Sequence, residues 1–364
     1  GVSLKEKHVV AAPAGCAVEA IRSGTTTMVD YMQVNPVPWL SDGEIETLGQ
    51  IGLRLIYGRG YRNTGADFGF PKELVENTGD VFMDVLRLKK KYESNESKMV
   101  KVWLAPAGAW ALTLQGLHET SEFALAHDIP LMMHMYETAT DEDICQKRYN
   151  CSALEYFKKA GLLKTHLLAV HAVHLGKPEI KAFQEGKVTI SHNPVSNMYL
   201  ASGVAPVPQM LRAGLTVGLA TDGAASNNCN DMLEVLKATA LLHKVYWHNP
   251  LAMTAFKALE MATIDAAKCI GMESEIGSLE AGKKADFFML NPYKCGRTCP
   301  VHDPIATLIY SAGSRGVEKV VIDGKTILEE DRFIGMDEER ILHRQQEMAE
   351  DLFKNAGYVN VLQN

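Results

Sequence analysis

Three apolar segments of this chain each end in a side chain that can bind a metal or transfer a proton. Residues 130–134 are Pro-Leu-Met-Met-His, residues 167–171 are Leu-Leu-Ala-Val-His, and residues 216–222 are Thr-Val-Gly-Leu-Ala-Thr-Asp. Segments that are apolar throughout, rather than at every second position, are typical of strands covered on both faces of a parallel sheet. In a parallel barrel, catalytic groups come from the carboxyl ends of several strands. The three segments therefore predict one active site at the carboxyl edge of such a sheet.

Strand and helix candidates alternate along the first 271 residues. The predicted strands are 25–31, 52–58, 100–106, 130–136, 167–173, 188–192 and 216–221. The predicted helices are 11–23, 72–92, 114–127, 152–160, 178–185, 207–213, 231–244 and 250–271. Such alternation implies parallel strands joined by crossover helices. The α/β pattern fits a (β/α)8 TIM barrel whose first strand is missing. The alternative is an open doubly wound sheet, which gathers its functional residues at one switch point.

The pattern changes after about residue 272, which predicts a boundary between two units, 1–272 and 273–364. Residues 277–290 predict a turn and a strand. The segments 317–323 and 326–329, joined by Gly-Lys, predict a hairpin. A charged helix is expected over 337–353.

Composition excludes several classes of partner. The net charge of −7 gives no reason to expect binding to nucleic acid or to an anionic membrane surface. No stretch approaches the roughly 18 consecutive apolar residues of a membrane span, and the first residues are too charged for a signal peptide. Seven cysteines, an odd number in a long chain, suggest reduced thiols in a cytoplasmic protein. A small-molecule substrate remains the expected partner.

His134 and Glu137 form the first candidate pair. A histidine at a strand end can bind a metal while a carboxylate in the next loop transfers a proton. The alternative is a core histidine beside a surface glutamate. In the next strand, His171 follows the apolar segment directly and is the better site candidate. His174 lies three residues further on, so it faces the other way and is expected to satisfy backbone groups or to cap a helix.

Asp222 is the strongest single candidate, because an aspartate that ends an apolar strand is costly to bury unless it is paired or metal-bound. Residues 191–197, Ser-His-Asn-Pro-Val-Ser-Asn, are either supports that orient the ligands or a hydrogen-bonded turn. Asn197, which ends this segment, is predicted to contact the substrate. Arg59 and Arg62 follow another strand and either bind an acidic or polar substrate group or are simply solvated.

Taken together, these residues resemble the amidohydrolase superfamily, in particular its branch of aminohydrolases and chlorohydrolases that act on heteroaromatic rings. The resemblance covers about residues 11–333. It is specific because seven motifs occur in order, whereas any one of them alone is a weak indication. The matching segments are 22–27, 134–138, 171–175, 191–197, 221–228, 277–286 and 302–304.

The resemblance implies a (β/α)8 barrel with one divalent metal, zinc or alternatively iron, and the remnant of a small β-sandwich. His134 and Asp222 would be metal ligands. His171 would hold the attacking water, Asp222 would take its proton, and Glu137 would protonate the ring nitrogen. The implied reaction is hydrolytic deamination of a purine, pterin or triazine ring. A bound metal lowers the pKa of water to about 7, which fits such chemistry at neutral pH.

Two departures from the family pattern limit this interpretation. The family carries a His-x-His pair on the first barrel strand, and the given sequence does not contain it, so we expect a fragment of a longer protein. Adenosine-type members often have Gly-Pro-His after another strand, where residues 105–110 are Ala-Pro-Ala-Gly-Ala-Trp. Trp110 is predicted to stack on the substrate there instead. Ring dechlorination, alkylamine removal and a non-catalytic barrel remain alternatives, and a homodimer is possible.

Overall fold

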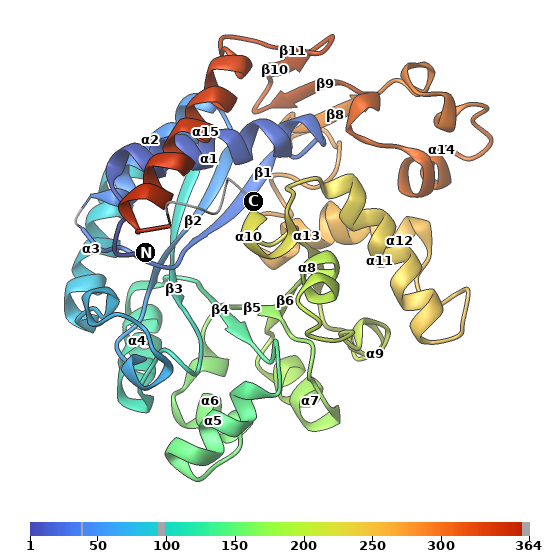
Figure 1. Cartoon of the computed structure of the whole chain (residues 1–364). Helices are drawn as coiled ribbons and strands as arrows, with labels where there is room; N and C mark the ends of the chain where they lie inside the picture. The colour runs from blue at the N-terminus through green and yellow to red at the C-terminus, as the bar shows by residue number, and fades with distance from the viewer. Residues whose placement is uncertain (38, 94–98, 359–364) are drawn as a thin grey trace.

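A curled sheet of seven parallel strands forms the centre of the computed structural model, which describes residues 1–37, 39–93 and 99–358. The strands are β1 Thr27–Met32, β2 Arg54–Tyr61, β3 Val100–Pro106, β4 Leu131–Met135, β5 Leu167–His171, β6 Thr189–His192 and β7 Val217–Leu219. Each strand pairs in parallel with its neighbours in sequence, and the helices lie outside the sheet (Figure 1). Within the described residues, β1 and β7 are left as two unpaired edges. The prediction of a barrel that lacks one strand is therefore confirmed.

The helices connect successive strands and cover the outer face of the sheet. They are α1 Glu6–Arg22, α2 Leu40–Ile51, α3 Thr78–Tyr92, α4 Leu114–His127, α5 Thr140–Tyr149, α6 Ala153–Lys159, α7 Lys177–Glu185, α8 Pro194–Tyr199, α9 Val207–Arg212, α10 Ala224–Asn227, α11 Met232–Tyr246, α12 Ala255–Ala262, α13 Ile264–Cys269, α14 Pro304–Ala306 and α15 Glu338–Asn355. The single helix predicted over 250–271 is wrong. It is two helices, because Thr263, with φ −125° and ψ −99°, leaves the helical region between them.

The core lies between the strands and the inner faces of these helices. All eight residues of β2 are buried, which explains why this segment is not alternately polar and apolar. On α3, Val81, Val85 and Leu88 are buried at a spacing of three to four residues, as expected for one apolar face of a helix. Burying each such side chain stabilises the fold by about 1.5–3 kcal/mol.

A second, antiparallel sheet of four strands in the order β11-β10-β9-β8 packs beside the barrel. Its strands are β8 Phe287–Leu290, β9 Val317–Ile322, β10 Lys325–Glu329 and β11 Arg332–Phe333. The predicted hairpin is β9 and β10, which turn at Gly324 with φ +77°. A buried ion pair joins the two sheets, since Nε of Arg54 on β2 lies 2.7 Å from Oδ2 of Asp286. The division into units 1–272 and 273–364 stays a prediction.

Helix α15 returns to the barrel and packs against α1, so the two ends of the described chain lie side by side (Figure 1). His8 contributes a hydrogen bond at 2.8 Å between its Nε2 and the carboxylate of Asp351, and Arg22 pairs with Glu338. No described helix is both long and apolar enough to cross a membrane. All seven cysteines are free thiols, which agrees with the prediction of reduced cysteines.

Candidate active site

His134 lies near the carboxyl end of β4, and the structure fixes which of its ring nitrogens carries the proton. Nδ1 is 2.9 Å from the carbonyl oxygen of Ala107, and a carbonyl can only accept, so Nδ1 donates. Burial first, and then the neighbouring His171, lower the pKa of His134 to about 4. The ring is therefore neutral at pH 7, and Nε2 keeps a lone pair for a metal or a proton.

The side chains of three further candidates converge on His134. The rings of His134 and His171 have centroids 5.4 Å apart. Nε2 of His171 lies 3.8 Å from Oε2 of Glu137 and 3.9 Å from Oδ2 of Asp222. These residues come from β4, from β5 and from the loops after β4 and β7, as expected if the carboxyl ends of parallel strands meet at one edge. The structure thus brings together the four residues to which we assigned metal or proton chemistry.

Asp222 is held as a carboxylate by several hydrogen-bond donors. Its Oδ2 accepts from the hydroxyls of Ser196 at 2.6 Å and Ser226 at 2.9 Å, and its Oδ1 accepts from the amide of Gly223 at 2.8 Å. Burial alone would raise the pKa of Asp222, but His171 and these donors outweigh burial, so the pKa is lowered. The group is therefore ionised at neutral pH and can accept a proton or bind a cation.

Glu137 has the opposite electrostatic environment. Burial raises the pKa of its carboxyl group, the charge of Asp222 raises it further, and His134 opposes both. The hydroxyl of Ser202 donates to its Oε1 at 3.5 Å. A carboxyl group with a raised pKa suits a proton donor, whereas one with a lowered pKa suits a proton acceptor. Glu137 and Asp222 thus form a carboxyl pair whose pKa values are shifted in opposite directions.

Two groups beside these residues, the buried Asp141 and the partly buried Tyr31, were missed by the sequence analysis. The Asp141 carboxylate accepts from the backbone amide of Tyr136 at 2.5 Å, which fixes the turn that presents Glu137. Burial raises the pKa of Asp141 to about 7. Tyr31, at the end of β1, places its ring 4.5 Å from that of His134 and donates to the Pro106 carbonyl at 2.6 Å. Position at a strand end is the only sequence feature that could have indicated Tyr31.

The backbone is strained where these side chains leave their strands. Tyr136, His171, Ala172 and Asp222 have φ values of +52°, +73°, +50° and +65°. Residues other than glycine adopt this left-handed region at a cost of about 1–3 kcal/mol each, and they do so mostly where neighbouring structure enforces it. Two of the four are candidate site residues, so packing and hydrogen bonding around the site are maintaining unfavourable backbone geometry.

The ligand chemistry suits a divalent metal, but the described chain supplies only part of a cage. Among the described residues, Nε2 of the neutral His134 ring has a hydrogen-bond contact only with the amide nitrogen of Gln33, at 3.5 Å. A neutral imidazole nitrogen and an ionised carboxylate are ligands that zinc and ferrous iron both accept. Within residues 1–37, 39–93 and 99–358, however, no group of three His, Cys, Asp or Glu side chains is placed to hold an ion. Catalytic zinc usually has three protein ligands. His134 and Asp222 therefore fit as two members of a larger ligand set.

A cavity of about 480 Å³ connects the site to the open side of the barrel. His134 and Asp222 line it together with residues of both edge strands, among them Met28 and Leu219. Asp30, on β1, and Glu44, on α2, also line it. Burial raises the pKa of both carboxyl groups, that of Asp30 to about 6. The cavity is thus bounded on two sides by unpaired strand edges.

Arg59 is paired with groups of this same chain. Its guanidinium is buried and donates to Asp84, to both carboxylate oxygens of Glu76 and to the Gly60 carbonyl. These contacts use four of the five guanidinium N–H groups. Two carboxylates from the same chain thus already neutralise the charge of Arg59, and its contact with a substrate group stays a prediction.

The other predicted substrate contacts have different surroundings. Arg62 lies with its guanidinium carbon 4.0 Å from the ring centroid of Phe70 and 5.3 Å from that of Trp110. Its Nε and Nη1 are buried without a hydrogen-bond partner among the described residues. Trp110 stacks on Phe70 with centroids 5.1 Å apart. Asn197 is buried, and its amide oxygen accepts from Nδ1 of His171 at 2.9 Å, so in this structure it orients that ring. Contact of these three with a substrate stays a prediction.

Comparison with known proteins agrees with this geometry. A model of the amidohydrolase family matches residues 4–327. The chain belongs to the amidohydrolase family. This amidohydrolase is 34% identical over 335 residues to a 5-methylthioadenosine/S-adenosylhomocysteine deaminase of Pelotomaculum thermopropionicum, covering 92% of the chain and 73% of the relative.

The fold of this amidohydrolase is also similar to those of solved structures. A zinc-bound adenosine deaminase from Xanthomonas campestris is 26% identical with a TM-score of 0.88, covering 96% of the chain and 76% of the neighbour. Atrazine chlorohydrolase from Arthrobacter aurescens TC1, complexed with zinc, is 27% identical with a TM-score of 0.88, covering 95% and 78%. Both neighbours belong to the classes of ring hydrolase that the motifs of this amidohydrolase indicate.

Proposed function

We propose that this chain carries most of the active site of a metal-dependent hydrolase that deaminates an aminated heteroaromatic ring of the purine, pterin or triazine type. The observation that supports this most directly is the convergence of His134, Glu137, His171 and Asp222 at the carboxyl ends of β4 to β7. The relation to an adenosine-type deaminase at 34% identity supports the same class of reaction.

Each of the four residues has a distinct part in this proposal. Glu137, whose pKa is raised, would donate a proton to the ring nitrogen beside the carbon that bears the amine. Asp222, which is ionised, would accept the proton of the attacking water. His171 faces both carboxyl groups through Nε2 and would orient that water between them. The metal would supply a water molecule with its pKa lowered to about 7.

The metal that we propose is zinc, because both structural neighbours carry it. His134 and Asp222 would be two of its ligands. The resemblance to the family implies a His-x-His pair as further ligands, and the unpaired edges of β1 and β7 beside the cavity offer a place for the strand that carries it. We expect the full-length gene product to bind about one metal ion per chain, and chelation to abolish its activity.

Replacing Glu137 with Gln in the full-length protein tests the proton-transfer role. Glutamine keeps the shape of the side chain but cannot supply the proton, so turnover should fall by about 10²–10⁴-fold, the usual contribution of such a group. Metal content should remain at the wild-type level. Glu122→Gln is a suitable control, because Glu122 is an exposed residue on α4. Full turnover in the Glu137 variant would rule out the assigned role.

Product analysis separates deamination from a second candidate, hydrolytic dechlorination or alkylamine removal. This alternative has specific support from the likeness to an atrazine chlorohydrolase. Incubation of the full-length protein with aminopurines and with chlorinated or alkylamino triazines should release ammonia. Release of chloride or alkylamine in its place would favour the alternative, and a metal-loaded protein without turnover on either set would favour a non-catalytic barrel.

Arg62 is the proposed contact for an acidic or polar group on the substrate. Its two unpartnered buried nitrogens, Nε and Nη1, would be satisfied by a carboxylate or hydroxyl of a ligand. Arg62→Lys keeps the charge but removes the planar set of donors. We expect KM to rise about tenfold or more with a smaller change in kcat, since a charge-assisted hydrogen bond contributes about 1.5–3 kcal/mol.

A further inference from the structure

Four hydrogen bonds hold the two peptide units that precede Glu137. In the first unit, the Met135 carbonyl accepts from the amide of Ala172 at 3.0 Å, and the amide of Tyr136 donates to the Asp141 carboxylate at 2.5 Å. In the second unit, the Tyr136 carbonyl accepts from the next two amides after Ala172, both at 2.9 Å. Three of these contacts come from the backbone of the segment after β5. The fourth comes from a side chain, that of Asp141, so it is the one that a substitution can remove.

Tyr136 needs this support, because its backbone lies in the left-handed region. Its φ is +52°, a value that a residue with a Cβ atom rarely adopts unless neighbouring structure enforces it. Its buried ring packs near those of Phe157 and Phe183, with centroids 5.7 and 6.1 Å away. The next side chain reaches the candidate site, where Oε2 of Glu137 lies 3.8 Å from Nε2 of His171. A change of φ at Tyr136 would therefore turn Glu137 away from His171.

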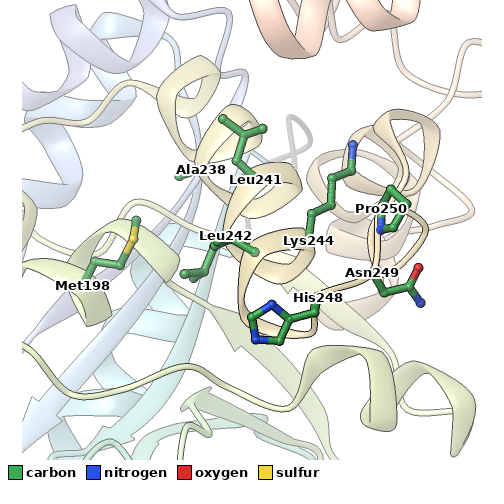
Figure 2. A pocket seen from close by; sticks show the side chains of 9 residues that line it. Met198, Ala238, Leu241, Leu242, Lys244, His248, Asn249 and Pro250 are labelled. Atoms are coloured by element: carbon green, nitrogen blue, oxygen red, sulfur yellow. The ribbon is translucent and has the colours of Figure 1, made fainter.

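Asp141 is the side chain best placed to maintain this geometry. It is 6% exposed in the first turn of α5, five residues after Tyr136, so its contact closes a short loop. Ser202 also reaches Glu137, but at 3.5 Å and from the segment after α8. Met198 of that helix lines an apolar groove beside α11 (Figure 2). The position of Ser202 thus depends on packing between remote segments, whereas the contact of Asp141 is local.

We propose that Asp141 is a positioning residue for Glu137, because its side chain holds the Tyr136 amide and so keeps Glu137 directed toward His171. The effect on turnover rests on the proposed function of Glu137 as the proton donor, whereas the effect on the backbone does not. The contact needs an acceptor oxygen. A full charge is disfavoured there, since burial raises the pKa of the Asp141 carboxyl group to about 7. An asparagine side chain offers the same acceptor without a charge.

Two substitutions in the full-length protein separate the acceptor from the charge. Asp141→Ala removes the acceptor, so kcat should fall by about 10–100-fold with less than about a threefold change in KM, because a displacement of about 1 Å can cost that much. Asp141→Asn should keep kcat within about threefold of wild type. Asp42→Ala is the matched control: Asp42 is 8% exposed in the first turn of α2, and its carboxylate accepts from Arg87. It should lose stability but keep kcat. An Asp141→Asn variant as slow as Asp141→Ala would overturn the proposal.

The same substitution in a Glu137→Gln background shows whether Asp141 acts through Glu137. If it does, Asp141→Ala should slow the Glu137→Gln protein by less than about threefold, because residues that act as a unit are not additive. A general loss of structure or of metal would slow both backgrounds by the same factor. An equal loss in the two backgrounds would therefore contradict the positioning role.

Hydrogen exchange of the Tyr136 amide tests the contact without any turnover. This amide should be protected in the wild-type protein. Asp141→Ala should speed its exchange by about tenfold or more, as expected for the loss of one hydrogen bond, and Asp141→Asn should not. An unprotected Tyr136 amide in the wild-type protein would overturn the proposal even if Asp141→Ala failed to fold. A protein with the expected exchange rates that turns over no ring substrate would contradict the proposed function and support the positioning of Glu137.

Discussion

Hydrogen bonds from serine hydroxyls, together with the nearby His171, lower the pKa of Asp222, and this makes Ser196 a residue whose loss should alter pH dependence. Ser196 is buried, and its hydroxyl donates to Asp222 at 2.6 Å. Ser196→Ala removes a donor that stabilises the carboxylate, so the pKa of Asp222 should rise. If Asp222 acts in its ionised form, the acid limb of the pH profile of kcat/KM should move to higher pH. Turnover at neutral pH should fall by about tenfold or more, because such a bond contributes about 1.5–3 kcal/mol.

The control for this prediction is Ser121→Ala. Ser121 is equally buried, but its hydroxyl donates to the backbone carbonyl of Leu117 within α4, far from any candidate site residue in sequence. Its loss should change stability slightly and leave the pH profile unmoved. An unchanged acid limb in the Ser196 variant would mean that Asp222 does not titrate in the reaction.

The sequence indicates where some side chains of the candidate site lie but not which partners others have, for a physical reason. His134, His171 and Asp222 end apolar strands, so their placement follows from the parallel sheet itself. Arg59 also follows from strand position, but its pairing with Glu76 and Asp84 depends on how α3 and a loop pack over β2. Such contacts join segments that are separated in the sequence. Their relative positions are known only once the chain has folded, so the sequence alone does not predict these contacts.

At the scale of single elements, β6 and α11 are joined by a buried histidine pair that should make stability depend on pH. Nε2 of His192 on β6 and Nε2 of His243 on α11 are 3.1 Å apart. Burial lowers the pKa of His243 to about 4 and lowers that of His192 as well. An unfolded histidine has a pKa of about 6.5. Between pH 6.5 and 4 the unfolded chain therefore binds protons that the folded chain does not, so stability is lost as pH falls through this window.

Urea unfolding at pH 7.5 and at pH 5 measures this loss. His243 should contribute about 2 kcal/mol to the difference, since roughly 1.5 pH units separate the unfolded pKa from pH 5 and each unit corresponds to about 1.4 kcal/mol. His243→Gln removes the titrating group and should reduce the difference. His127→Gln replaces an exposed histidine on α4 and should leave it unchanged. Equal pH dependence in wild type and His243 variant would contradict the prediction.

One element that the sequence analysis missed has a sequence that disfavours its own structure. Helix α2 was not predicted: it contains Gly43 and Gly49 and follows Trp39, which has φ +72°. Glycines weaken a helix by about 1 kcal/mol each, so burial of residues such as Ile45 and Leu48 must hold α2. The seven strands were all predicted. For inner strands such as β4 and β5, burial on both faces makes the sequence apolar almost throughout, whereas the edge strand β1 is only partly buried.

For the whole molecule, one buried ion pair should control how firmly the small sheet is attached to the barrel. Arg54 is fully buried on β2, and the Asp286 side chain is 2% exposed just before β8. Two guanidinium nitrogens donate to the two carboxylate oxygens, at 2.7 and 3.0 Å. Asp286 also accepts from the amide of Asp323 at the β9–β10 turn. The pair therefore holds together three segments that are remote in sequence.

Removing only the arginine should be far more harmful than removing both partners. Arg54→Met leaves a buried carboxylate without its cation, which costs about 3–5 kcal/mol, whereas replacing a buried pair by apolar residues is often close to neutral. The double variant Arg54→Met with Asp286→Leu should thus regain much of the stability lost in the single variant. Lys319→Met is the control, because the Lys319–Glu329 pair on the small sheet is partly exposed and should contribute less than about 1 kcal/mol. The free energy of urea unfolding is measured for the single variant, the double variant and the control. If the single variant is no less stable than the double variant, the pair does not attach the small sheet to the barrel.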